Sequence, residues 1–306
     1  MNESSVSLST PKQKKRFFLS REFYFFISAL ATMVLFFEFF RMGMIWKNWE
    51  SSQQTTFGEF FSSFYVGARF DLATSCYLAI PCLIFGYLPW VFGKRSAGYQ
   101  KFFWMTFIFI ISILFFLLLM EYEFFKEFQT RYNQLAFQYM DESDTVVGII
   151  WYGYPVFKYL FCWFCILLCF SWTLRFLYQK IITAKPLTNS YSEVSFGKKW
   201  ISIFLLVAII VIGARGGFGR APLRWGDAFS QENEFINQMS LNGLYTLGHS
   251  LLDVYNRKDR TSLWKEQIPQ EESQQRVRDL LLAPGEVLVN KEFNTLARVQ
   301  NKIENT

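Results

Sequence analysis

The sequence predicts an all-α polytopic membrane protein with five transmembrane helices, external juxtamembrane helices and no α/β catalytic domain. Three observations predict this class. Five long apolar stretches fill most of residues 22–214. Hydrophobic residues make up 52% of the 306 residues, with 37 Phe among them. The basic residues fall on alternating sides of the apolar stretches, as they do in proteins that cross a bilayer repeatedly.

Each stretch suits a helix that crosses the hydrocarbon layer, which is about 30 Å thick and takes about 20 apolar residues. The fifth is the shortest, and it spans only if it extends by about a turn at each end. We expect spans at 22–46, 70–92, 102–122, 155–178 and 199–214, forming a transmembrane domain over 22–214. A basic cytoplasmic tail precedes it at 1–21, and an external helical segment and an external linker follow at 215–260 and 261–306.

The Lys and Arg residues around the spans predict the orientation. Five precede the first span, three lie between the second and third, and five lie from the end of the fourth span to the start of the fifth, whereas the other two loops hold Lys47, Lys126 and Arg131. Since these residues accumulate in cytoplasmic loops, we expect a cytoplasmic N-terminus and an extracytoplasmic C-terminus in the cell (inner) membrane. The net charge of +6 then reflects topology, and we expect no nucleic-acid partner. The first apolar run is too long for a signal peptide and lacks a small-residue cleavage site, which predicts an uncleaved anchor.

Outside the spans, helical patterns occur at Gln129–Met140, Asp227–Asn256 and Glu271–Leu282. The second of these carries large apolar side chains at helical spacing, so we expect it to lie on the membrane surface or against the spans. All five Cys lie within the second and fourth spans, where buried thiols behave as small apolar groups. His249 is the single histidine, and one His without suitably spaced partners does not predict a zinc site.

Ionisable residues near the membrane are the remaining candidates, since they are costly there and mark function by default. Glu38 and Arg41 are three residues apart in the first span, which predicts an intramembrane charge pair. The other charges expected at the same external headgroup level are Arg69, Asp71, Glu121, Glu123, Arg131, Arg215 and Arg220. Two interpretations stay open: the charges pair with one another and tie the bundle together, or the Arg residues hold a lipid phosphate, which a guanidinium matches bidentately.

Three stretches together resemble the membrane portion of the lipoteichoic acid synthase family, phosphoglycerol transferases related to sulfatases and alkaline phosphatases. They are YVGARFDLATSCYLAIPCLI at 65–84, RYNQLAFQYMDESDTVVGIIWYGYP at 131–155 and ARGGFGRAPLRWGDAFSQENEFINQMSLNGLYTL at 214–247. The resemblance implies an external sulfatase-like domain with a threonine nucleophile and a divalent metal, commonly manganese. It also implies transfer of a glycerophosphate headgroup from an anionic lipid such as phosphatidylglycerol.

The chain ends about where that catalytic domain would begin, so we expect no catalytic residue and no metal site here, and manganese only with a separate catalytic domain. The predicted function is therefore a membrane-anchoring and lipid-binding module of the cell envelope that is not an active enzyme alone. From their shared depth and from the resemblance, we expect headgroup binding at Arg69, Asp71, Arg131, Arg215, Arg220 and Asp227. The alternatives are an assembly partner that recruits other envelope enzymes and a small lipid transporter.

Overall fold

The computed structural model describes residues 19–265 apart from 53–54, 94–95, 141–147, 149–150, 184–194, 218 and 220. Beyond 265 it describes 269, 272, 275–276, 280, 282, 286–288 and 298–300. The chain divides into two compact units, Met1–Ser250 and Leu251–Thr306. The described helices and strands are α1 (Arg21–Lys47), α2 (Trp49–Ser52), α3 (Phe57–Cys82), η1 (Leu83–Tyr87), α4 (Leu88–Val91), α5 (Ala97–Phe128), α6 (Gln134–Met140), α8 (Val156–Tyr178), η2 (Gln179–Thr183), α9 (Phe196–Arg215), η3 (Trp225–Ala228), α10 (Glu234–Met239), α11 (Gly243–Lys265), β1 (Glu286–Leu288) and β2 (Arg298–Gln300).

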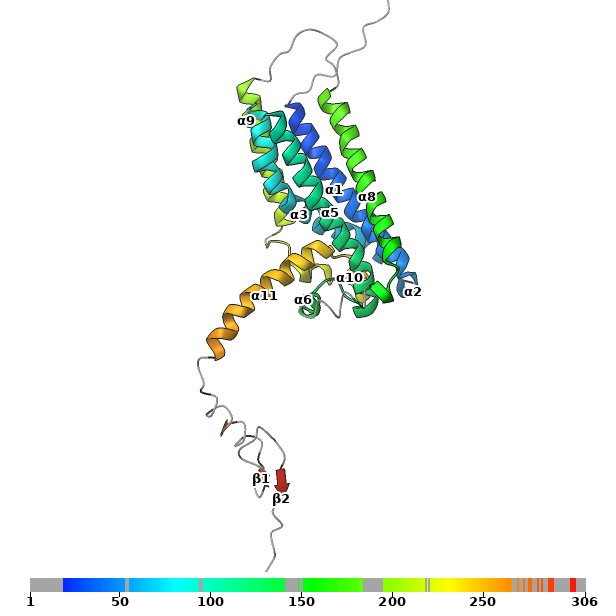
Figure 1. The fold of residues 1–306 in the computed structure, drawn as a ribbon, viewed down its shortest axis with the longest axis vertical. Helices are drawn as coiled ribbons and strands as arrows, with labels where there is room; N and C mark the ends of the chain where they lie inside the picture. The colour runs from blue at the N-terminus through cyan, green and yellow to red at the C-terminus, as the bar shows by residue number, and fades with distance from the viewer. Residues whose placement is uncertain are drawn as a thin grey trace, which may run out of the picture. The chain divides into compact units, whose positions relative to one another are not determined.

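Within the described residues, five helices are long and apolar enough to cross a membrane, which confirms the predicted all-α polytopic class. They are α1, α3 continued through η1 and α4, α5, α8 continued through η2, and α9. These helices run side by side, and α2, α6 and α10 lie at one end of the bundle, which we call the α10 end (Figure 1). The opposite end, where α1 begins, is the N-terminal end.

All five spans are longer than the apolar stretches that predicted them, and the second and third differ most. α3 begins at Phe57, 13 residues before the predicted start at 70, and α5 runs from Ala97 to Phe128 where 102–122 was expected. α3 begins early because Thr56 and Glu59 form a reciprocal capping box, in which each side chain accepts from the other residue's backbone N–H. The first two turns of α3, FGEFFSSF at 57–64, are therefore helix where the sequence predicted loop.

The second span contains a π-helical turn, η1, between its two prolines. Pro89 has no N–H, so the carbonyl of Phe85 loses its α-helical donor. The hydroxyl of Tyr99 on α5 donates to that carbonyl over 2.6 Å. A neighbouring helix thus satisfies a backbone group that lipid could not.

The bundle packs around α1, which contacts α3 and α9 as well as α5 and α8. Between α1, α5 and α8 the rings of Phe36, Phe115 and Phe170 meet with centroids 5.1–5.8 Å apart. Between α3 and α9 the close approach depends on Gly213, because a Cβ there would lie 2.4 Å from the Sγ of Cys76. Small residues commonly allow membrane helices to approach in this way.

The prediction of one continuous helix over Asp227–Asn256 is wrong. The structure has a 3₁₀ turn, η3, then α10, and then a new helix, α11, that begins at Gly243. The leucine spacing that predicted one helix belongs to α11, whereas residues 240–242 turn the chain between two helices. In the second external loop, α6 covers Gln134–Met140 of the predicted Gln129–Met140. Most of the helix predicted at Glu271–Leu282 lies outside the described residues.

The second unit contains a short antiparallel pair of strands. β1 pairs with β2, with Val287 opposite Val299.

Candidate functional site

A buried ion-pair cluster lies at the α10 end, where α1 and α3 cross. Arg41 on α1 is 2% exposed, and its Nη1 lies 2.5 Å from the Oε2 of Glu38, one turn earlier. The charge pair predicted between these two residues is therefore present. The guanidinium fits because α3 has Gly67 beside it, where a Cβ would lie 2.2 Å from the Cζ of Arg41.

Asp71 on α3 is the second carboxylate on Arg41. Nη2 of Arg41 donates to its Oδ1 over 2.9 Å, and Nη1 lies 2.8 Å from its Oδ2. Oδ1 also accepts from the Nδ2 of Asn242 over 2.7 Å. Because Asp71 is fully buried, the two donors replace water at Oδ1, whereas Oδ2 has the ion contact with Arg41 and no hydrogen bond among the described residues.

A second buried ion pair lies nearby and joins α5 to the turn that follows it. Gln129, in the left-handed conformation with φ 53°, ends α5 and turns the chain back toward the bundle. This brings the Nη1 of Arg131 to 3.1 Å from the Oε2 of Glu121, and both residues are buried. Gly243 provides the space, since a Cβ there would lie 2.0 Å from Glu121 Oε2.

Both arginines also bind the end of α10. Nε of Arg41 donates to the carbonyl of Met239 over 2.8 Å, and Nε of Arg131 donates to the carbonyl of Gln238 over 2.9 Å. The last carbonyls of a helix lack intrahelical donors and carry partial negative charge, so cations are favoured there. We call the five side chains that hold residues 238–242 in the bundle the clamp: Arg41, Asp71, Glu121, Arg131 and Asn242.

Asn242 joins the clamp to α11. Its Oδ1 accepts from the backbone N–H groups of Leu244 and Tyr245 at 3.0 and 3.2 Å, which caps the new helix. Tyr245 then donates its hydroxyl to the carbonyl of Leu223 over 2.8 Å. Burial raises the pKa of Tyr245 to about 12, so this hydroxyl stays protonated and remains a donor at neutral pH.

The structure divides the residues predicted to bind a lipid headgroup. Asp71 and Arg131 are buried and bonded within the protein, so their polar atoms do not face lipid. Arg69 is half-buried and donates from Nε to the carbonyl of Gly216 over 3.3 Å. Arg215 is exposed at the end of α9, and its Nη2 donates to the carbonyl of Gly219 over 3.1 Å.

The other two predicted residues lie outside the clamp. Asp227 is exposed, and its Oδ2 accepts from the backbone N–H of Arg224 at the start of η3. Arg220 lies outside the described residues.

The prediction missed Gln238, Met239 and Asn242 as contact residues. The backbone carbonyls of the first two have no side-chain signature. Asn242-Gly243 was a readable signal, because Asn is a preferred helix N-cap and this one precedes the first residue of α11.

The clamp residues bind other groups of the protein. Each guanidinium lies against a carboxylate and a helix-terminal carbonyl, so its hydrogen-bonding capacity is directed to protein groups. In the described part of the chain, no three His, Cys, Asp or Glu side chains gather as a metal site would require.

No family model, curated protein or solved structure matches this chain.

Proposed function

We propose that this chain is the membrane module of a phosphoglycerol transferase of the lipoteichoic acid synthase type. In this proposal it anchors in the cell membrane with its N-terminus in the cytoplasm, as the distribution of Lys and Arg favours. The α10 end then faces the outside. There the module holds the segment after α9 next to an anionic lipid such as phosphatidylglycerol, on which a sulfatase-like domain acts.

The observation that carries the proposal is the clamp. Residues 234–246 could have remained a flexible connection between the bundle and whatever follows. Instead, two buried arginines bind the carbonyls of Gln238 and Met239, and Asn242 binds Asp71. Removing one partner of such a buried pair is typically destabilising by about 3–5 kcal/mol, so the segment is held firmly. A catalytic domain that works on a membrane lipid needs a fixed height above the bilayer, and the clamp supplies it.

Lipid contact in this proposal falls to Arg69 and Arg215. They come from adjacent helices, since Arg69 donates to the carbonyl of Gly216, the residue after Arg215. Both lie at the α10 end and retain exposed surface, unlike Asp71 and Arg131. A phosphate between two guanidinium groups gains charge-assisted hydrogen bonds to each of them.

The first experiment tests the function. We would incorporate the purified chain into vesicles with fluorescent phosphatidylglycerol and manganese, and assay headgroup release with and without a soluble catalytic domain of the family in trans. We expect no release by the chain alone, and faster release by the catalytic domain when the chain is present. Asn242→Asp should reduce that stimulation, whereas Asn233→Asp, the same change at the N-cap of α10, should preserve it. Release by the chain alone, or no stimulation in trans, would contradict the proposal.

The second experiment tests the lipid contact. Arg69→Glu and Arg215→Glu each reverse one charge at the α10 end. Lys126→Glu is the control, because Lys126 is an exposed basic residue in the last turn of α5. We expect the two Arg variants to weaken retention of phosphatidylglycerol by about fivefold or more, since one basic group near an anionic surface contributes roughly 1 kcal/mol. Equal retention by all three folded variants would remove Arg69 and Arg215 from the proposal.

A further inference from the structure

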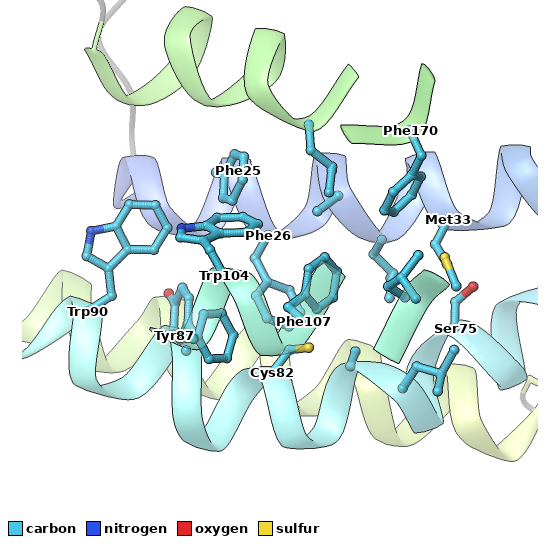
Figure 2. A pocket seen from close by; sticks show the side chains of 18 residues that line it. Phe25, Phe26, Met33, Ser75, Cys82, Tyr87, Trp90, Trp104, Phe107 and Phe170 are labelled. Carbon is cyan, nitrogen blue, oxygen red and sulfur yellow. The ribbon is translucent and has the colours of Figure 1, made fainter. Parts of the chain in front are cut away.

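A second feature of the bundle, an apolar cavity, lies toward the N-terminal end, away from the clamp. A cavity of about 90 Å³ lies between α1, α3 with η1, α5 and α8. Figure 2 shows its wall, made by aromatic side chains such as Phe25, Trp104 and Phe107, with Ser75 and Met33 together at one side. Apolar cavities of this kind stay dry and accept apolar ligands.

The cavity adjoins a wider groove. A space of about 550 Å³ lies between α5 and α8, and Trp104 and Leu174 line both it and the cavity. The groove is within the size range of small-molecule sites. Its polar lining is near the end of α8 and includes Arg175, Tyr178 and Gln179. The ligand that fits both spaces therefore has an apolar part and a polar end directed toward the N-terminal end of the bundle.

The depth of the polar end matches a membrane interface. Trp90 and Tyr178 stack with ring centroids 6.0 Å apart, and Phe25 packs edge-on against both. Trp and Tyr concentrate at the headgroup level of membranes, while the hydrocarbon lies deeper. Arg175, on the turn of α8 before Tyr178, is at a depth where a lipid phosphate lies.

Arg175 has capacity for such a ligand. It is exposed, and its side chain makes no hydrogen bond or ion pair with any residue the structure describes. A guanidinium binds phosphate through two parallel hydrogen bonds. Acyl chains are the apolar molecules available at this depth, so a phospholipid supplies both the phosphate and the chain.

We infer that an anionic phospholipid binds at this place, with its phosphate at Arg175, one acyl chain along the groove between α5 and α8, and part of that chain in the cavity. This site is at the opposite end of the bundle from Arg69 and Arg215, and its lipid belongs to the other leaflet. With the proposed orientation this is the cytoplasmic leaflet, and only that identification rests on the proposed function.

Ser75 offers a way to test the chain position. Its hydroxyl is buried, lines the cavity and has no hydrogen-bond partner among the described residues. Ser75→Leu removes this unsatisfied group and fills part of the cavity, so the variant should fold at least as well as the parent protein. It should nevertheless exclude the end of an acyl chain.

The experiment uses the full chain in nanodiscs with phosphatidylglycerol that carries a diazirine near the end of one acyl chain. We expect crosslinks on the cavity wall, on peptides containing Met33, Leu78 or Phe107, and about fivefold more label from phosphatidylglycerol than from a matched phosphatidylcholine probe. Arg175→Gln should remove that preference. Lys101→Gln, which removes an exposed charge on α5 at the same end, should preserve it, and Ser75→Leu should reduce the cavity crosslinks severalfold.

Three results would overturn the inference. Label spread evenly over exposed side chains such as Phe161 and Phe204 would show ordinary contact with bulk lipid. Equal labelling by the anionic and zwitterionic probes would show that the site does not select a lipid with a net negative headgroup. Unlabelled cavity peptides beside strongly labelled neighbours would show that the cavity is closed to lipid or filled by the protein's own side chains.

Discussion

The substitution Asn242→Asp isolates one bond of the clamp. The side chain of Asn242 does two things, since Oδ1 caps α11 and Nδ2 donates to Asp71 over 2.7 Å. Asp caps helices about as well as Asn, so the cap survives the change. The donor is lost, and a second carboxylate takes its place beside the first.

The expected effect follows from these contacts. A hydrogen bond to a charged group contributes about 1.5–3 kcal/mol, and the added like charge increases the loss. We therefore expect the region around residues 234–250 to become less stable by at least about 2–3 kcal/mol. At 1.4 kcal/mol for each factor of ten, local opening becomes about 30- to 150-fold more frequent. Acidification should reduce the difference in stability between the variant and the parent chain, because a protonated carboxyl at 242 can donate as the amide did.

Hydrogen exchange of the backbone amides in α10 and the first turns of α11, measured in nanodiscs, reads this opening directly. Asn233→Asp is the matched control, because Asn233 caps α10 and its Nδ2 donates to the neutral hydroxyl of Thr55. We expect the control to change exchange little. If both variants exchange alike, or if neither differs from the parent chain, the bond between Asn242 and Asp71 does not hold the segment and the clamp is refuted at this residue.

Two further predictions concern the same end of the bundle. Arg131→Met leaves Glu121 buried without its ion-pair partner, which should lower stability by about 3–5 kcal/mol and the melting temperature in detergent by about 6 °C or more. An unchanged melting temperature would contradict the buried pair. Gly67→Ala should destabilise by about 1–3 kcal/mol because its Cβ collides with the guanidinium of Arg41. Gly58→Ala, in open space on the same helix, should be neutral or stabilising. Equal melting temperatures of the two variants would contradict the close approach of Gly67 to Arg41.

The spans could be predicted from sequence because the bilayer fixes their length. An apolar stretch of about 20 residues is typical of a transmembrane helix and uncommon elsewhere, and α1 and α8 match their predicted bounds within one or two residues. The start of α3 was not found from hydropathy, since Gly58, Glu59 and two Ser alternate with the Phe residues of its first turns and interrupt the apolar run. Thr56 and Glu59 did carry the capping-box pattern, so the local signal was present and the apolar criterion overlooked it.

The candidate site was harder to predict, because the sequence indicates how deep a residue lies in the membrane but not which way its side chain points. Asp71 and Arg69 are two residues apart near the middle of α3, yet Asp71 faces protein while Arg69 keeps exposed surface. Nothing local distinguishes them, because Asp71 is bonded to residues 30 and 171 positions away. The interpretation that charges pair within the bundle describes Asp71 and Arg131, and lipid contact is left as a proposal for Arg69 and Arg215.

In our proposal the clamp both stabilises the bundle and fixes the position of the external segment. One double variant separates these two roles. Replacing a buried ion pair with apolar residues of similar size often preserves or raises stability. We therefore expect Glu121→Met combined with Arg131→Met to recover most of the melting temperature that Arg131→Met loses. The carbonyl of Gln238 would still lack the guanidinium donor, which methionine cannot replace, and would keep the backbone N–H of Leu241. Hydrogen exchange in α10 should then stay fast although the bundle is stable again. If α10 regains its protection in the double variant, the arginine serves only stability, and the clamp does not fix the position of the external segment.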